Sequence, residues 1–154
     1  MIRNVKLEDI QELAPIYKQL YDDVDIGEFW TIENTEKLLR YFYDRQKDLF
    51  FVAEEDGKAI GAVMSNLKPW FDGNRLNDTE IFVAKEYQHK HIAKELYKCH
   101  LETAKSIYGC KVIEFHTYGD ENEFPQNWYK RIGFKKDEEL IIMSANINDI
   151  LNKI

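Results

Sequence analysis

The chain has 154 residues, of which 44% are hydrophobic and 32% charged, and its formal net charge is −7. These values are ordinary for one globular domain, so we expect a single domain over residues 1–154. The acidic balance disfavours a nucleic-acid or anionic-membrane partner, because contacts with phosphate groups need clustered Lys and Arg.

Neither a membrane span nor an export signal is predicted. The longest apolar runs fall far short of the ~20 residues that a membrane helix needs, and the N-terminus has no apolar core of the signal-peptide type. The two cysteines, Cys99 and Cys110, form no C-x-x-C pair and have no histidine at zinc-ligand spacing. We therefore expect free thiols, no metal and a cytoplasmic location.

The N-terminal part reads as a strand followed by two helices. Residues 2–6 suit a short strand, and residues 8–21 carry apolar residues at helical spacing, with Pro15 indicating a kink or a late helix start. The segment that follows is acidic and contains Asp22, Asp23, Asp25 and Glu28. Thr31 or Asn34 is expected to cap a second helix.

A hairpin is predicted next, because Asp56-Gly57 suits a type I′ turn in which both residues have positive φ. Its strands are residues 49–53 and about 59–66. A further strand from about residue 76 to 84 follows a loop, which is marked by Pro69 and the cluster Asp72, Gly73 and Asn74.

The C-terminal half alternates helices with strands. Residues 91–107 form a predicted helix that ends at Gly109, the usual left-handed position. Its predicted apolar stripe is Ile92, Leu96, Cys99, Thr103 and Ile107. The remaining predicted elements are a strand over 111–116, a helix over 124–131 ended by Gly133, a strand over 139–145 and a helix over 146–154. This order indicates an α/β chain with a mixed sheet and helices on its faces.

The stretch from Glu80 to Leu96 carries the clearest chemical signal. It reads as a strand, a turn rich in basic residues and then a helix. A helix N-terminus offers unpaired N–H groups and the positive end of the dipole, which together bind phosphate. Lys90 and Lys94 add positive charge at that end.

Two stretches together resemble the GNAT superfamily of acetyl-CoA-dependent N-acetyltransferases. Gln88-His89-Lys90-His91-Ile92-Ala93 lies on the family's cofactor motif Gln/Arg-x-x-Gly-x-Gly/Ala, and Glu80 to Val83 match its fourth strand. A later family pattern is matched by Asn122, Trp128, Tyr129, Gly133 and Phe134. The order of elements also agrees, so the resemblance covers nearly the whole chain.

The resemblance implies a fold, a cosubstrate and a set of roles. The fold is an α/β (α+β) arrangement with a mixed, mostly antiparallel sheet of six to seven strands, about four helices, and splayed fourth and fifth strands. Acetyl-CoA would be the cosubstrate, and no metal would be needed. The implied cofactor-binding residues are Phe82, Val83, Gln88, His89, Lys90, His91, Ile92, Ala93, Lys94 and Asn122.

The implied chemistry is direct transfer of the acetyl group to an amine. Glu80 would take the amine's proton, directly or through water, with His116 as a rival base. Tyr129 would protonate the departing thiolate, and the amide of Val83 could stabilise the oxyanion. Cys99 is interpreted as a core residue.

The sequence departs from the family pattern at His91, where the family has glycine. Glycine allows positive φ and close approach of phosphate, and histidine tolerates positive φ better than most residues. The imidazole could contact a phosphate or block the pocket. Pro125 likewise stands where a small alanine is usual.

Two classes of function follow. The first is an active N-acetyltransferase for a small, cationic amine such as a polyamine or an aminoglycoside, framed by the acidic segment 22–28 with Asp72, Asp78 and Glu80. The alternative is a degenerate member that serves as a non-catalytic coenzyme A sensor or protein-binding module. An N-terminal acetyltransferase for proteins fits less well, since the glycine motif is altered. Trp70 and Phe71 would suit a homodimer interface.

Overall fold

The structure is a computed structural model that describes residues 1–24, 26–120 and 122–153. The chain forms two compact units, Met1–His116 and Thr117–Ile154. The strands all belong to the first unit. Among the described residues, no helix has the length and apolar character that crossing a bilayer requires.

The sheet of the first unit has its strands in chain order. The strands are β1 (Ile2–Asn4), β2 (Phe50–Glu55), β3 (Lys58–Trp70), β4 (Gly73–Val83) and β5 (Val112–Ile113). The first four pair antiparallel, while β5 runs parallel to β4. The expected mixed, mostly antiparallel sheet is confirmed.

The expected number of six to seven strands was too high, because the described residues form five. The predicted strand over 139–145 is absent, and the one over 111–116 is reduced to β5. Leu140, Ile141, Ile142 and Met143 are between 68% and 86% exposed. An apolar run favours extended backbone, but it becomes a strand only where a neighbour can accept its hydrogen bonds.

The described α-helices are α1 (Asp9–Val24), α2 (Ile32–Gln46), α3 (Ile92–Tyr108), α4 (Gln126–Arg131) and α5 (Ile147–Leu151). Helix α1 continues through Pro15 instead of starting after it. Thr31 is the N-cap of α2, as expected, and its Oγ1 accepts a hydrogen bond of 3.1 Å from the N–H of Asn34.

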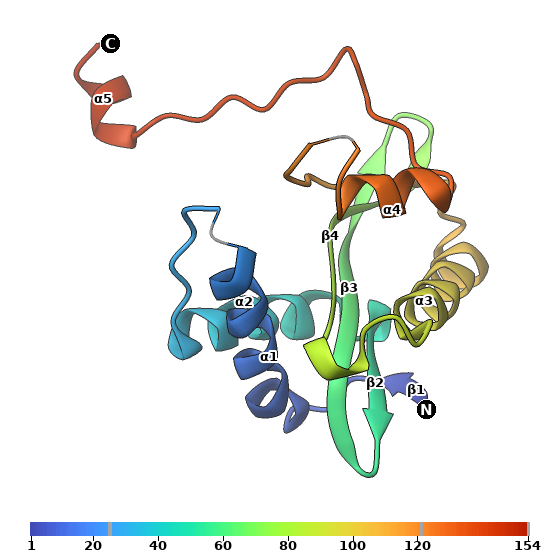
Figure 1. Cartoon of the computed structure of the whole chain (residues 1–154). Helices are drawn as coiled ribbons and strands as arrows, with labels where there is room; N and C mark the ends of the chain where they lie inside the picture. The colour runs from blue at the N-terminus through green and yellow to red at the C-terminus, as the bar shows by residue number, and fades with distance from the viewer. Residues whose placement is uncertain (25, 121, 154) are drawn as a thin grey trace. The chain divides into compact units, whose positions relative to one another are not determined.

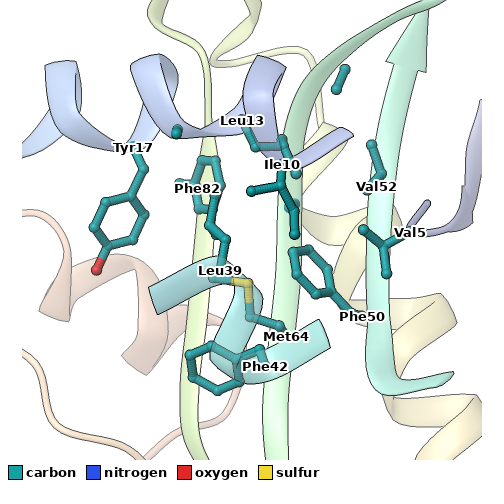
Figure 2. Packing of buried hydrophobic residues seen from close by; sticks show 13 residues of the cluster. Val5, Ile10, Leu13, Tyr17, Leu39, Phe42, Phe50, Val52, Met64 and Phe82 are labelled. Atoms are coloured by element: carbon teal, nitrogen blue, oxygen red, sulfur yellow. The ribbon is translucent and has the colours of Figure 1, made fainter. Parts of the chain in front are cut away.

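Helices cover both faces of the sheet in the first unit. Figure 1 shows α1 and α2 on one side of the strands and α3 on the other. The larger core lies under α1 and α2 and includes Leu13, Tyr17, Leu39, Phe50 and Phe82. In Figure 2, Tyr17 lies at one end of this cluster, with its hydroxyl turned away from the other side chains.

The two hairpins differ in how well the sequence predicts them. Asp56 and Gly57 have φ of 51° and 76°, so the predicted turn between β2 and β3 is confirmed. The loop predicted at 69–74 is shorter than expected, because Pro69 belongs to β3 and pairs with Asn74. Proline lacks the N–H that a ladder uses, yet here it lies near the end of the strand, where this loss matters least.

The second unit contains α4 and α5. The N–H of Phe134 donates to the carbonyl oxygen of Tyr129 at 3.0 Å, just after α4 ends. The rings of these two residues make an edge contact at 5.6 Å, and the ring of Trp128 lies 5.1 Å from that of Tyr129. Gly133 has a φ of 108°, which agrees with its predicted role in ending the helix.

Candidate active site

Strand β4 has one edge that β5 only partly covers. Pairing between them is limited to Arg75 and Leu76, with one further bond of 2.9 Å from the N–H of Glu114 to the carbonyl of Leu76. From residue 77 to 83, no strand of the described chain pairs with this edge. The expected separation of the fourth and fifth strands is thereby seen.

The backbone of Val83 faces this open edge. The N–H of Ala84 donates to the carbonyl of Ile60 on β3 at 2.8 Å. Because backbone groups alternate between the two sides of an antiparallel strand, Phe82 also faces β3, whereas Ile81 and Val83 face away from it. An N–H group of the kind expected to contact the cosubstrate therefore points into the gap.

Gly61 allows β3 to approach β4 closely at this point. It lies opposite Val83 in the register. A Cβ atom at position 61 would stand 2.6 Å from the carbonyl oxygen of Phe82 and 3.0 Å from the Cα of Val83. Any other residue would therefore push the two strands apart.

A bulge interrupts the pairing of β4 just before Glu80. Asn77 pairs with Asn66 and Glu80 with Met64, so two residues of β4 stand opposite the single Ser65 of β3. Asp78, one of the two, has a φ of 50°. Such bulges bend a strand and redirect the side chains beside them.

Glu80 lies on the same face of β4 as Phe82, beneath α1, because side chains two positions apart share a face. The side chain is half-buried. The pKa of this carboxyl is raised to about 7: burial raises it most, a hydrogen bond from Tyr17 lowers it, and the charges of Glu28 and Asp78 raise it. A carboxyl with this pKa can both accept and release a proton near neutral pH.

Tyr17 joins Glu80 to a group of aromatic rings. Its ring lies 5.2 Å from that of Phe82, 4.7 Å from that of Tyr21 and 5.3 Å from that of Trp30. We call these four residues the aromatic wall. Tyr17, Tyr21 and Trp30 were not predicted as site residues, although aromatic residues on both sides of an acidic segment were a usable signal.

The turn between β4 and α3 has the shape of an anion-binding loop. A short 3-10 helix, Lys85–Tyr87, is followed by Gln88, whose Nε2 donates to the carbonyl of Val83 at 3.1 Å. His89 and His91 have φ of 63° and 64°. The histidine at the motif glycine thus keeps the left-handed conformation for which glycine is normally used.

The start of α3 leaves several donors available. Across the described part of the chain, the backbone N–H groups of residues 89–93 have no backbone acceptor. Exposed basic or titratable side chains surround them, namely His89, Lys90, His91 and Lys94. Together with the helix dipole, these groups make the N-terminus of α3 electropositive.

The other two expected site residues, Tyr129 and Asn122, belong to the second unit. Tyr129 is half-buried in α4. Asn122 is exposed, and its carbonyl oxygen accepts a hydrogen bond of 3.2 Å from Nδ2 of Asn127. Their assignment to acid catalysis and to cofactor binding stays a prediction.

His116, the rival base, is exposed at the end of the first unit. Asp25 of the acidic segment lies outside the described residues. Within those residues, no group of three or more His, Cys, Asp or Glu side chains could hold a metal ion.

The comparisons with known proteins decide the family. The acetyltransferase (GNAT) family model matches residues 11–134, which is most of the chain. The chain belongs to the GNAT family.

Named relatives agree with this GNAT assignment. An uncharacterised N-acetyltransferase of Methanocaldococcus jannaschii is 28% identical over 141 residues, covering 89% of this chain. The chain spans 61% of the length of that relative.

Solved structures share the GNAT fold along almost all of the chain. A possible acetyltransferase from Clostridium difficile 630 has a TM-score of 0.79 at 16% identity, covering 96% of this chain and 97% of its own. A predicted acetyltransferase from Clostridium acetobutylicum, solved with acetyl-CoA, has a TM-score of 0.72 at 19% identity, covering 94% and 95%. At these identities the likeness concerns the fold.

Proposed function

We propose that this GNAT chain is an N-acetyltransferase that moves the acetyl group of acetyl-CoA directly to a small, cationic amine in a ternary complex. The observation that carries the proposal is Glu80, a half-buried carboxyl on β4 beside the open edge of that strand, and its raised pKa of about 7 suits a proton acceptor. A structural carboxylate on a solvated strand would have no reason to be held at this pKa.

The open edge of β4 and the N-terminus of α3 suit acetyl-CoA. The backbone of Ile81 also faces the gap, where an amide of the pantetheine arm could pair with this edge in the manner of a strand, and the N–H of Val83 is left for the thioester carbonyl. The unpaired N–H groups of residues 89–93, with Lys90 and Lys94, suit the pyrophosphate. His91 has the positive φ for which the motif uses glycine, so the presence of histidine instead of glycine leaves the loop conformation intact.

The proposed reaction divides the proton transfers between two residues. Glu80 accepts the proton that the ammonium group of the acceptor loses, directly or through a water molecule. The free amine then forms a C–N bond with the thioester carbon while the C–S bond breaks, and the nitrogen releases its second proton to solvent. Val83 donates its N–H to the carbonyl oxygen, and Tyr129 gives a proton to the departing thiolate.

Acidic residues favour a cationic acceptor. Glu28 and Asp78 both act electrostatically on Glu80. Within the described ranges, no Lys or Arg side chain forms an ion pair with any of these three carboxylates. Their charge is therefore available to attract an ammonium group.

The cosubstrate half of the proposal is tested by thermal unfolding with acetyl-CoA. At ~100 times its Kd, a ligand adds about 2.7 kcal/mol, which raises Tm by roughly 5–10 °C for a chain of this size. We expect wild type and His91→Gly to show this rise. His91→Val should lose it, because a β-branched residue does not accept a φ of 64°. Equal shifts in all three proteins would contradict the role of this loop.

The transfer half is tested by amine-dependent release of coenzyme A. We expect Glu80→Gln to lower kcat/KM by about 10²-fold or more, and Tyr129→Phe to lower kcat, with the thermal shift by acetyl-CoA retained in both. A Glu80→Gln enzyme with wild-type kcat/KM would exclude Glu80 as the base. Binding of acetyl-CoA without transfer to any amine would favour a non-catalytic chain.

A further inference from the structure

The aromatic wall stands next to Glu80 and, apart from the hydrogen bond of Tyr17 to that carboxyl, has no part in the proposed proton transfers. Its members come from α1 (Tyr17, Tyr21), from the segment before α2 (Trp30) and from β4 (Phe82). Tyr21 and Trp30 have ring centroids 5.8 Å apart. The wall therefore joins three separate parts of the first unit beside the base.

Only part of this wall is available to a ligand. Tyr17 and Phe82 are 2% and 7% exposed, so they belong to the core. Tyr21 and Trp30 are half-buried and present the accessible ring surface. A ligand at Glu80 would meet these two rings rather than the buried pair.

A carboxylate holds the accessible indole in place. The Nε1–H of Trp30 donates to Oε2 of Glu28 at 2.9 Å. Nearby acidic residues are neutralised in a different way, since Asp22 pairs with Lys18 and Asp23 with Lys85. Glu28 has a neutral partner in this bond, so it keeps its full negative charge beside the ring.

We propose that the acceptor is a primary ammonium compound that carries an aromatic group, an arylalkylamine, with its ring lying against Tyr21 and Trp30 and its charge near Glu28. This inference rests on the proposed function and narrows its substrate class. An aromatic ring packed against Tyr21 and Trp30 gains from contact area and from the offset or edge-on geometry that aromatic pairs prefer. A polyamine or an aminoglycoside has no flat apolar group that would use this surface.

The inference is tested by binding before any turnover is measured. Titration calorimetry on the full chain would compare 2-phenylethylammonium with ethylammonium, which lacks the ring, and with 2-phenylethanol, which lacks the charge. We expect the first to bind at least about tenfold more tightly than either of the others. Equal affinity for phenylethylammonium and ethylammonium would overturn the inference.

Variants then assign each preference to its residue. Trp30→Leu should reduce the preference for the ring to within about threefold, and Glu28→Gln should reduce the preference for the charge. Phe71→Leu is the matched control, because Phe71 is an 89% exposed aromatic residue on the turn between β3 and β4. Should Trp30→Leu fail to fold, Glu28→Gln changes only an exposed side chain and still tests the site.

The two proposals fail in different ways. If ethylamine and phenylethylamine were acetylated at equal kcat/KM, the proposed aromatic specificity would be excluded and the proposed acetyltransferase activity would stand. Tight, Trp30-dependent binding of phenylethylammonium without acetyl transfer would keep the binding site and remove the proposed reaction.

Discussion

At Glu80, opposing influences act on a single carboxyl group. Burial raises its pKa and the charges of Glu28 and Asp78 act in the same direction, while the hydrogen bond from Tyr17 stabilises the carboxylate. The result, about 7, is the value at which a base is still half deprotonated in neutral solution. Tyr17 is therefore a positioning residue that limits how far burial can raise the pKa.

Removal of the Tyr17 hydroxyl should shift the pH profile. Tyr17→Phe removes the bond that favours the carboxylate, so the pKa of Glu80 should rise. The acid limb of kcat/KM should then move up by about 0.5–1 pH unit, as expected for a hydrogen bond of about 1 kcal/mol. The measurement is kcat/KM against pH with a single amine.

Tyr108→Phe provides the control for this shift. Its hydroxyl also donates to a carboxylate, that of Asp48 in the short 3-10 helix Lys47–Leu49, and Tyr108 is the last residue of α3, at the opposite end from the anion-binding loop. We expect a similar loss of stability without movement of the acid limb. An acid limb that stays in place in Tyr17→Phe would show that Glu80 is not tuned by this hydroxyl.

At the scale of an element, α3 serves the site at one end and the core along its side. The buried side contains Leu96, Tyr97, His100 and Ala104. His100 is fully buried, and neither of its ring nitrogens has a hydrogen-bond partner among the described residues. Burial lowers the pKa of His100 to about 4.

His100 should make the chain sensitive to mild acid. The unfolded chain binds the proton near pH 6.5 and the folded chain only near pH 4. The contribution of His100 to stability is therefore complete above pH 6.5 and falls as the pH drops towards 4, by about 3 kcal/mol in total. Urea unfolding at several pH values should show this fall as a difference between wild type and His100→Phe, because the raised pKa of Glu80 changes stability in the opposite direction in both proteins.

His116→Gln is the control for the acid effect, since His116 is exposed. It should keep the wild-type dependence on pH between 7 and 4. A wild-type slope in His100→Phe would assign the acid sensitivity to other groups.

The predicted stripe of α3 was wrong in part, and His100 shows why. The prediction placed Cys99 and Ile107 in the core, but Cys99 is half-buried and Ile107 is 62% exposed. The true buried side is turned by about one residue, because it includes Tyr97 and His100, which a count of aliphatic residues passes over. The sequence predicts that this segment is a helix. Which side of the helix is buried depends on how it packs on the sheet, and that is not visible in the sequence.

Local signals in the sequence were more reliable than distant ones. The turn at Asp56-Gly57 and the cap at Thr31 follow from the residues themselves, and both were predicted correctly. The hydrogen bond of Tyr17 with Glu80 joins residues that are far apart in the chain, so no pattern in the sequence could show it. The roles of Glu80 and Tyr129 came from the family resemblance and still await their test.

At the scale of the molecule, a buried ion pair fastens the start of the chain to the first unit. Arg3 of β1 donates to both oxygens of Asp9 at the start of α1, at 2.7 and 2.8 Å, and to Glu54 of β2 at 2.6 Å. Burial alone would raise the pKa of Asp9, but Arg3 holds it below its usual value. The start of α1 and the end of β2 are therefore both held by the guanidinium of Arg3.

Removal of Arg3 alone should be more damaging than removal of the whole pair. Arg3→Met leaves the carboxylate of Asp9, which is 3% exposed, without its partner, at a cost of about 3–5 kcal/mol. The double variant Arg3→Met/Asp9→Leu should cost less than that. A double-mutant cycle by chemical denaturation measures the coupling, and strict additivity of the two changes would contradict it.

Gly61 has a consequence for how this sequence can vary over time. Its missing side chain lets two backbones touch beside the gap of β4, so the width of that gap depends on a residue that contacts nothing in it. Selection for the site would therefore act on a buried position of β3, the middle strand of the sheet. Even alanine at this position would move β3 and β4 apart, and would thereby change the shape of the candidate site.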